Sequence, residues 1–389
     1  MLYLNHRNLG ATMQNDGFSR RVFFRNVSLA STGALASLPG IARGDAGDPA
    51  PEPAWPVTVE SYPLVEPGKT TGVGRFKLTT LDNMPAAYQE KLRAYAPDME
   101  FTLCRDDAQF RKEVAEANVI YGWFSREHLQ AARQLRWIQW PAAGVENILY
   151  PELVDSPIVL TNMQRMYSPT ISETAIGLIL TLTRGLNRYT DQTREHVWKE
   201  LDGLTEISGL TLGLVGLGGI GTDTAYRAHY GFHMKVLAVD PKPLPKPAFV
   251  AELHSLEWLP KMVPQVDVLM SAAPHTPVSQ GMFNEAIFRA MKPAAYFINV
   301  SRGKLVNTPD LIRALKEGWI AGAGLDVAYR EPLPPDDPLW TAGNLIITSH
   351  SSAVSKGSTE RCYNLFCENV RRYVSGLPLL NVVDKKRGY

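Results

Sequence analysis

The stretch TLGLVGLGGIG at residues 211–221 decides the fold. Its first five residues form a β-like run, and the glycines that follow fit the pattern G-x-G-x-x-G. A tight turn, a close approach of phosphates and close helix packing each need a residue without a side chain. Residues 222–230 are suited to the helix behind the turn, whose N-terminal N–H groups would attract a pyrophosphate. The stretch therefore predicts a dinucleotide site at Gly216, Gly218, Gly219, Ile220 and Gly221.

An acidic residue follows at the distance that such a site requires. Asp240 ends the next β-like run, 240 − 221 = 19 residues after Gly221, near the spacing of about 20 typical of a carboxylate on the ribose hydroxyls. Its charge repels the 2′-phosphate of NADP, so NAD is the favoured cofactor. Lys242 and Lys246 act against this preference, although the prolines between them are expected to hold both in solvent. An NADP-preferring reductase stays an alternative.

Short apolar runs alternate with helix-length segments on both sides of this stretch. Such alternation predicts parallel sheets with helices on their faces. One long helix over residues 169–198 is expected to link two α/β units, with Ile171, Ala175, Leu178, Ile179 and Leu182 on a single apolar face. The β-like runs expected before it are 75–81, 99–104, 118–122, 136–140 and 158–162, and those after it are 211–216, 236–240, 267–272, 295–300, 323–327 and 345–348.

The length of 389 residues exceeds that of one ordinary core. We therefore predict an α/β fold of two doubly wound parallel-sheet domains with a cleft between them. Residues 47–162 and 353–389 are expected to form a substrate domain, and residues 163–352 the dinucleotide-binding domain.

Charge and composition argue against several kinds of partner. Lys and Arg number 40 against 39 Asp and Glu, so electrostatics favour neither nucleic acid nor an anionic membrane surface. No stretch after residue 45 has the roughly 20 apolar residues of a membrane span, so no stable membrane association is expected. The 3 cysteines leave one unpaired under any scheme. No Cys/His cluster has zinc spacing, so neither structural disulfides nor a metal is expected.

The beginning of the chain has a different character. Residues 19–25 read SRRVFFR and precede a mildly apolar stretch at 27–42, a layout typical of a secretory signal. Arg20-Arg21 resemble the twin-arginine type, with Phe24 and Arg25 where Leu and Lys are more usual. We expect residues 1–46 to hold this signal and the start of a linker, the export machinery to be a partner, and the protein to be periplasmic. The alternative is a disordered basic tail on a cytoplasmic protein.

Three polar residues follow predicted strands of the second unit. Arg302 follows the run 295–300, Glu331 the run 323–327 and His350 the run 345–348. Each alone has an ordinary interpretation as a surface or loop residue. Ligands of open α/β sheets bind at the carboxyl ends of strands. Together the three offer a cation for a carboxylate, an imidazole for proton transfer and a carboxylate that orients the imidazole.

Four ordered motifs now reveal a family resemblance. Residues 212–221, 291–307 (MKPAAYFINVSRGKLVN), 320–333 (IAGAGLDVAYREPL) and 347–352 (ITSHSS) resemble signatures of the D-isomer-specific 2-hydroxyacid dehydrogenases. Residues 135–162 and 379–389 (LLNVVDKKRGY) are also similar to that family, near its glyoxylate and hydroxypyruvate reductases. The resemblance covers most of the chain from about Trp55 onward. It implies a flavodoxin-like substrate domain, a Rossmann NAD-binding domain and a homodimer with the linking helix at its two-fold interface.

The resemblance also implies a role for each site residue. Arg302 would bind the substrate carboxylate and carbonyl, His350 would be the acid/base, and Glu331 would support His350. A Glu at 331, where a Gln would mark the formate dehydrogenases, argues against that branch. The N–H groups of Ala143, Gly144 and Val145 would form a nest for the substrate carboxylate. The cofactor residues implied in addition to the glycine turn and Asp240 are Pro274, Thr276, Val300 and Asp326, the last receiving the nicotinamide carboxamide.

Two departures from the family pattern lie near the site. Ser349 replaces a frequent proline before the histidine, and Trp140-Pro141 replace small polar residues. The second departure reshapes the expected substrate pocket, so the acid itself is not named by the resemblance. Trp123, Phe124 and Trp140 are candidates to face the substrate, with core packing the favoured interpretation.

The predicted reaction moves hydride between NAD(H) and C2 of a small 2-hydroxy or 2-oxo acid, with the D-isomer implied by the family. Arg302 would hold the 2-oxo acid bidentately and polarise its carbonyl. His350 would donate a proton to the alkoxide, and Glu331 would favour the imidazolium by its negative charge. The alternative is an NAD-sensing interaction protein on the same fold, since the family includes transcriptional corepressors. The export signal argues against that alternative.

Overall fold

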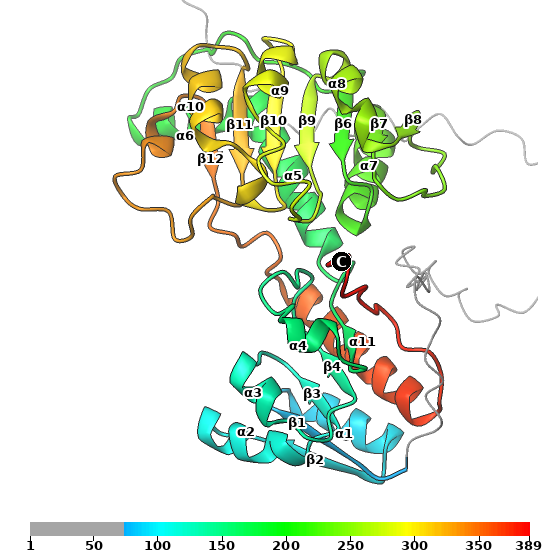
Figure 1. Ribbon diagram of the computed structural model, residues 1–389. Coiled ribbons are helices and arrows are strands. Elements are labelled where there is room, and N and C mark those ends of the chain that lie inside the picture. The colour runs from blue at the N-terminus through cyan, green and yellow to red at the C-terminus, as the bar shows by residue number, and fades with distance from the viewer. Residues whose placement is uncertain (1–73) are drawn as a thin grey trace, which may run out of the picture. The chain divides into compact units, whose positions relative to one another are not determined.

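A computed structural model describes residues 74–389, which form two parallel sheets flanked by helices (Figure 1). This confirms the predicted class of two parallel-sheet α/β domains. The domain limits and the cleft stay predictions. The predicted export signal lies outside the described residues.

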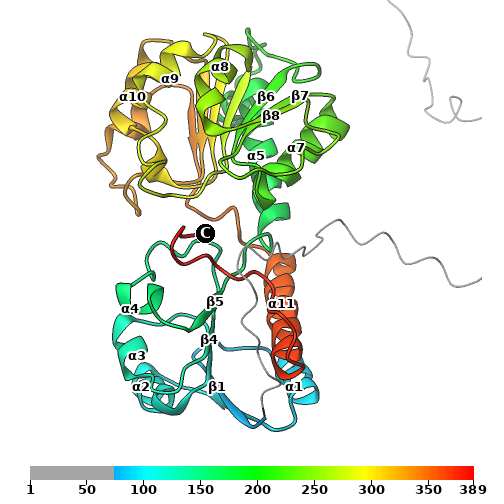
Figure 2. The same cartoon turned by 45° about the vertical axis from the view of Figure 1, so that its right-hand side comes forward.

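The first sheet has the strand order β2-β1-β3-β4-β5, with every neighbouring pair parallel. Neighbouring residues of one strand point to opposite faces, so Trp137 of β4 packs with one cluster and Ile138 with the other. Helices α1 and α11 cover the first face, and α2, α3 and α4 the second (Figure 2). The elements are β1 Phe76–Thr80, β2 Met99–Leu103, β3 Val119–Tyr121, β4 Trp137–Gln139, β5 Val159–Thr161, α1 Ala86–Tyr95, α2 Asp107–Glu113, α3 Arg126–Ala131, α4 Pro151–Val154 and α11 Lys356–Val374.

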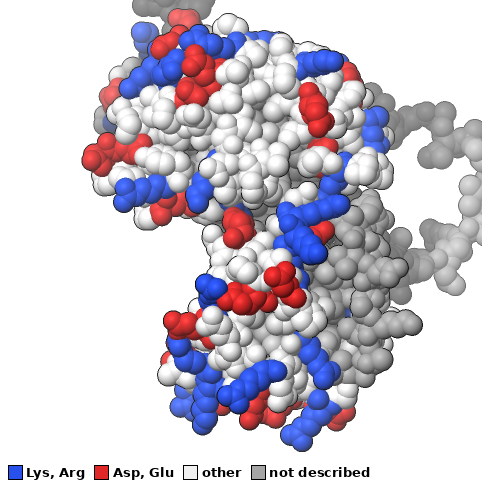
Figure 3. All heavy atoms as spheres, in the orientation of Figure 1, with Lys and Arg blue, Asp and Glu red and all other residues white. Residues whose placement is uncertain are grey.

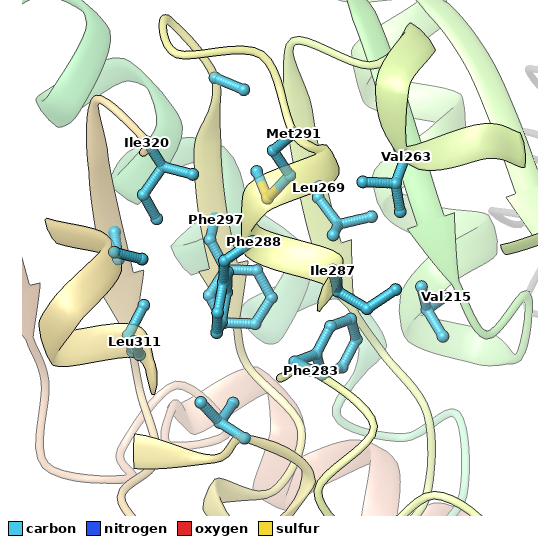
Figure 4. Close-up of a cluster of buried hydrophobic side chains, with 14 of the residues drawn as sticks. Val215, Val263, Leu269, Phe283, Ile287, Phe288, Met291, Phe297, Leu311 and Ile320 are labelled. Atoms are coloured by element: carbon cyan, nitrogen blue, oxygen red, sulfur yellow. The ribbon is translucent and has the colours of Figure 1, made fainter. Parts of the chain in front are cut away.

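The second sheet has the order β12-β11-β10-β9-β6-β7-β8 and is also parallel. The order reverses between β6 and β9, the kind of switch point at which α/β sheets bind ligands. Helices α5 and α7 pack on one face, and α8, α9 and α10 on the other, where Figure 4 shows Phe283, Phe288 and Phe297 in contact. The elements are β6 Thr211–Val215, β7 Lys235–Val239, β8 Glu252–His254, β9 Val268–Ser271, β10 Tyr296–Asn299, β11 Gly322–Leu325, β12 Leu345–Ile347, α5 Ser168–Thr183, α6 Leu186–Arg194, α7 Gly219–Phe232, α8 Leu259–Met262, α9 Glu285–Ala290 and α10 Thr308–Lys316.

The prediction of one helix over residues 169–198 is wrong. Helix α5 ends at Thr183 and α6 begins at Leu186, because Gly185 between them adopts a left-handed conformation with φ +61°. Glycine takes this conformation without steric cost, so the chain turns there. The five apolar residues predicted to share one face are all buried, which confirms that face.

Surface and composition are ordinary across the described part of the chain. Lys and Arg are interspersed with Asp and Glu on the face shown in Figure 3. None of the helices in residues 74–389 is long and apolar enough to cross a bilayer. In the same residues no group of three or more His, Cys, Asp or Glu is placed to hold a metal ion. The three cysteines are buried free thiols.

Candidate functional site

The glycine turn between β6 and α7 is built from close backbone contacts. Gly216 has φ +98°, and a Cβ there would lie 2.8 Å from the carbonyl oxygen of Ala272. A Cβ on Gly221 would lie 2.1 Å from the carbonyl oxygen of Gly216. Both positions therefore need glycine for the turn itself. A Cβ on Gly218 would meet nothing within 4 Å, so the space in front of this residue is open to a ligand.

Helix α7 begins at this open space without a side-chain cap. Gly218 is its N-cap residue and supplies no side chain to the N–H groups of the first turn. A helix of 14 residues with free N–H groups and a positive dipole end attracts a pyrophosphate. The turn thus fits the phosphates of a dinucleotide, and Gly216, Gly218, Gly219, Ile220 and Gly221 all belong to it.

Asp240 lies directly beside the turn, at the end of β7. Its side chain is only 9% exposed. Oδ2 accepts a hydrogen bond from the N–H of Leu217 at 2.8 Å, and Oδ1 accepts one from the N–H of Lys242 at 2.8 Å. The carboxylate therefore braces the glycine turn against the loop after β7.

Of the two lysines after Asp240, Lys242 is not held in solvent, which corrects the expectation from the intervening prolines for this residue. Lys242 is half-buried, and its ammonium lies over the ring of Tyr389. Lys246 is exposed as a residue, but its Nζ donates a hydrogen bond to the carbonyl of Val250 at 2.9 Å. The expectation of a solvent-exposed side chain is therefore confirmed for Lys246 and wrong for Lys242.

The three predicted catalytic residues follow β10, β11 and β12, three neighbouring strands of one parallel sheet. His350 and Glu331 are in direct contact, with 2.7 Å between Nδ1 and Oε2. The second oxygen of Glu331 accepts a hydrogen bond from the N–H of Ala328 at 3.0 Å. The carboxylate is therefore fixed on one side and orients the imidazole on the other, which leaves Nε2 of His350 to face outward.

Asp326 holds the backbone around His350. It is 1% exposed, and its Oδ1 accepts hydrogen bonds from Oγ1 of Thr348 at 2.5 Å and the N–H of Ser351 at 3.1 Å. Its Oδ2 accepts from the N–H and the hydroxyl of Ser352. The N–H of His350 donates to the carbonyl of Asp326 at 2.7 Å. Sequence reasoning assigned this carboxylate to the nicotinamide and missed its contacts with the histidine loop.

Arg302 contacts a residue that sequence reasoning missed. Its Nε donates to Oε1 of Glu146 at 2.5 Å, and its Nη1 donates to the carbonyl of Ser301 at 2.8 Å. Burial alone would raise the pKa of Glu146, but the hydrogen bond and positive charge of Arg302 lower it below its usual value. Glu146 directly follows the predicted nest at 143–145, which was the one available signal in the sequence.

The predicted nest lies against the same guanidinium. An ideal Cβ on Gly144 would lie 1.9 Å from Nη2 of Arg302, so a larger residue here would displace the guanidinium. Among the described residues, no acceptor contacts the N–H groups of Ala143, Gly144 or Val145. The carbonyl of Gly144 is fixed, because it accepts a hydrogen bond from Trp140 Nε1 at 2.8 Å. Three N–H groups and a cation therefore offer a binding place for an anion.

The remaining predicted residues lie in the loops around these strands. Pro274 and Thr276 belong to a turn fixed by Ser279, whose hydroxyl donates to the carbonyl of Pro274 at 2.7 Å. Val300 is buried directly after β10. Of the three aromatic candidates, Phe124 and Trp140 are buried in the core of the first sheet, as the favoured interpretation predicted, and Trp123 is 62% exposed.

Comparisons with known proteins agree with this geometry. Residues 176–352 match the family model of the D-isomer specific 2-hydroxyacid dehydrogenase NAD binding domain. The chain is 33% identical over 304 residues to the glyoxylate reductase of Korarchaeum cryptofilum, a match that covers 74% of this chain and 90% of that protein.

Solved structures show the same likeness. A D-isomer specific 2-hydroxyacid dehydrogenase family protein from Aeromonas salmonicida has a TM-score of 0.71 and 32% identity, covering 80% of this chain and 100% of its own. An NADPH-dependent glyoxylate/hydroxypyruvate reductase from Sinorhizobium meliloti, in complex with NADP and sulfate, has a TM-score of 0.70 and 26% identity. The match covers 81% of this chain and 100% of that chain.

Proposed function

Because the chain belongs to the D-isomer specific 2-hydroxyacid dehydrogenase family, we propose that it reduces a small 2-oxo acid of the glyoxylate or hydroxypyruvate type to the D-2-hydroxy acid. The family resemblance seen in the motifs is confirmed, and with it the reaction class of a hydroxyacid dehydrogenase that uses a nicotinamide cofactor. One observation carries the proposal. The His350–Glu331 pair follows strands of the same sheet whose glycine turn opens onto the N-terminus of α7.

Some residues of the site bind the substrate, and others transfer the proton. Arg302 and the N–H groups of 143–145 hold the substrate carboxylate, because the guanidinium and the nest lie together. His350, whose Nδ1 is held by Glu331, donates the proton from Nε2 to the oxygen on C2. When bound, the nicotinamide supplies the hydride. The glycine turn and Asp240 would hold its dinucleotide, and Pro274, Thr276 and Val300 would lie along it.

The substrate is tested by turnover. Purified protein is assayed with NADH and a panel of glyoxylate, hydroxypyruvate, pyruvate and bulkier aryl 2-oxo acids. The first two are expected to give the highest kcat/KM. Turnover of none of these acids, in protein that binds NADH, would overturn the proposal and favour a binding role for the site.

We propose NAD as the preferred cofactor. The buried carboxylate of Asp240 lies beside the glycine turn, where its charge opposes a 2′-phosphate. A lower KM for NADH than for NADPH supports this preference, and the reverse order contradicts it.

Glu331→Gln is expected to lower kcat by roughly 10- to 100-fold and to change KM little. The amide has the size of the carboxylate but lacks its negative charge beside Nδ1 of His350, so it orients the imidazole less strongly. Steady-state kinetics across pH 5–9 measure both constants, and the pH profile of kcat should change shape. An unchanged profile with full kcat would remove Glu331 from the mechanism.

Glu146→Gln is expected to lower the free energy of unfolding at pH 7 by about 1 kcal/mol, the upper range for a part-exposed ion pair. Arg302 lowers the pKa of Glu146 in the folded state. The pair therefore stabilises the protein above the unfolded pKa, and this stability is lost as pH falls through the lowered folded value. Urea unfolding at pH 7 and pH 3.5 should show a smaller difference in the free energy of unfolding between wild type and variant at pH 3.5 than at pH 7. Glu90→Gln, an exposed carboxylate without an ion pair in the described residues, is the control.

We propose that the protein is a homodimer through the outer face of α5 and α7. An apolar groove there is lined by Ile176, Leu180, Tyr230 and Phe232, and Tyr230 is 55% exposed. A second copy of the same face would cover it, as a two-fold interface requires. Light scattering is expected to give twice the chain mass, and Leu180→Arg to give the monomer. A monomer mass for wild type at micromolar concentration contradicts the dimer.

We propose that the protein is exported to the periplasm by the twin-arginine route. The support is the sequence of residues 19–46, and the route suits a protein that folds around its cofactor before transport. Fractionation of cells that express the full chain tests this. Recovery from the cytoplasm alone, with the first 46 residues intact, would contradict export.

A further inference from the structure

The backbone carbonyls behind the nest at residues 143–145 each accept a hydrogen bond. The pairs are the N–H of Met163 with the carbonyl of Ala142 at 3.0 Å, Nδ2 of Asn162 with that of Ala143 at 2.6 Å, and Nε1 of Trp140 with that of Gly144 at 2.8 Å. The carbonyl one residue earlier, that of Pro141, accepts from the hydroxyl of Tyr167 at 2.6 Å. A continuous run of carbonyls is therefore held in place.

These hydrogen bonds set the direction of the N–H groups of the nest. In a trans peptide the C=O and the N–H point in opposite directions in one plane. The bond to the carbonyl of Ala143 therefore orients the N–H of Gly144, and the bond to the carbonyl of Gly144 orients the N–H of Val145. A hydrogen bond to the carbonyl also polarises the peptide, so its N–H becomes a stronger donor. The nest is thus oriented before a ligand binds.

The N–H of Val145 is a buried donor that calls for a ligand. Val145 is 1% exposed, and none of the residues 74–389 supplies an acceptor for its N–H. Buried backbone N–H groups are almost always paired. Nη2 of Arg302 lies against the neighbouring Gly144, as the 1.9 Å to an ideal Cβ there shows. An anion placed beside this guanidinium would supply the missing acceptor.

The indole of Trp140 is itself held rigidly. Trp140 is 5% exposed, and its ring packs edge-on against those of Trp123 and Phe124, with centroids 4.6 and 5.5 Å away. Its backbone N–H donates to the carbonyl of Thr161 at 2.8 Å. The family pattern has small polar residues at this place, and a small side chain has no indole N–H. The bond to Gly144 is therefore a feature of this chain.

We propose that Trp140 is a positioning residue for the carboxylate of the substrate. Its indole N–H holds the carbonyl of Gly144, so that the N–H of Val145 is aimed at the carboxylate beside Arg302. Tyr167 holds the start of the same run of carbonyls. This inference rests on the proposed function and deepens it, because it states how the carboxylate is recognised. Trp140 touches no reacting atom, so its removal should weaken binding and leave the chemical step unchanged.

Trp140→Phe keeps an aromatic ring and removes the N–H. It is expected to weaken the binding of oxamate to the NADH complex about fivefold, the usual effect of one lost hydrogen bond. Oxamate carries a carboxylate beside an amide carbonyl, so it resembles a 2-oxo acid that is not reduced. KM for glyoxylate should rise by a similar factor, while kcat changes less than about twofold. Calorimetry gives the dissociation constants of oxamate and NADH, and the latter should be unchanged.

Trp137→Phe is the matched control. Trp137 is also buried, and its Nε1 donates to Oγ1 of Thr161 at 2.8 Å, away from the carbonyls of the nest. Urea unfolding is expected to show a loss of stability in both tryptophan variants, but only Trp140→Phe should bind oxamate more weakly. Tyr167→Phe removes one hydroxyl and keeps the ring, so it tests the same run of carbonyls in a variant that is expected to fold. Oxamate binding there should weaken about twofold to threefold.

An unchanged dissociation constant for oxamate in Trp140→Phe would overturn the inference. If that variant does not fold, the same result in Tyr167→Phe would overturn it. Equal weakening in Trp137→Phe would overturn it too, since the cause would then be a general loss of packing. In each case turnover of glyoxylate by wild type leaves the proposed function intact. Wild type that binds oxamate and turns over no 2-oxo acid would overturn the proposed function alone, and weaker oxamate binding in Trp140→Phe would still support the inference.

Discussion

His350→Gln is expected to lower kcat by about 10²–10⁴-fold, the usual contribution of a positioned acid or base. The imidazole is held at Nδ1 by Glu331 and offers Nε2 for proton transfer. Glutamine has a similar size and hydrogen-bonding capacity but does not transfer a proton at neutral pH. Steady-state kinetics with glyoxylate and NADH measure the loss.

NADH binding should persist in the same variant, because His350 follows β12 and the glycine turn follows β6. Fluorescence titration separates this result from a folding defect. His254→Gln removes another exposed histidine paired with a glutamate, His254–Glu252 at 3.2 Å, and should keep full kcat. A His350→Gln enzyme with kcat near that of wild type would show that another group is the acid.

Arg302→Lys is expected to lower kcat/KM by about 100-fold although the positive charge is retained. The guanidinium already uses Nε for Glu146 and Nη1 for Ser301, and its planar fork still presents Nη2 beside the nest. A lysine ammonium is a point charge on a flexible stem, so it does not donate hydrogen bonds to Glu146, Ser301 and the substrate carboxylate at the same time.

The effect of this change on substrate binding is measured by kcat/KM with a series of 2-oxo acids. Arg126→Lys, at an exposed ion pair with Glu152, is the matched control and should leave kcat/KM unchanged. A loss below about tenfold in Arg302→Lys, about 1.4 kcal/mol, would show that the planar guanidinium is not needed to bind the carboxylate.

Local patterns in the sequence determined the sheets and the position of the glycine turn. The run at 211–215 and the glycines after it predicted β6 and a helix behind the turn, because backbone conformation and alternation of apolar residues are local properties. Helix α7 begins at Gly219, earlier than the predicted 222. The places of Arg302, Glu331 and His350 followed from the rule that parallel strands end at one edge. Short or irregular elements were not predicted, as β8 with three residues and the break at Gly185 show.

Contacts between distant residues were decided only by the tertiary structure. Glu146 meets Arg302 across 156 residues of sequence, and Tyr389 meets Lys242 across 389 − 242 = 147. Asp326 stays a predicted cofactor residue from its motif, and only the structure shows that its carboxylate also accepts hydrogen bonds from the loop of His350. The sequence showed which residue types are present and which strands several of these residues follow. It did not show which distant residue each side chain contacts. A side chain pairs with whatever the path of the chain brings within about 3 Å, and local periodicity does not encode that path.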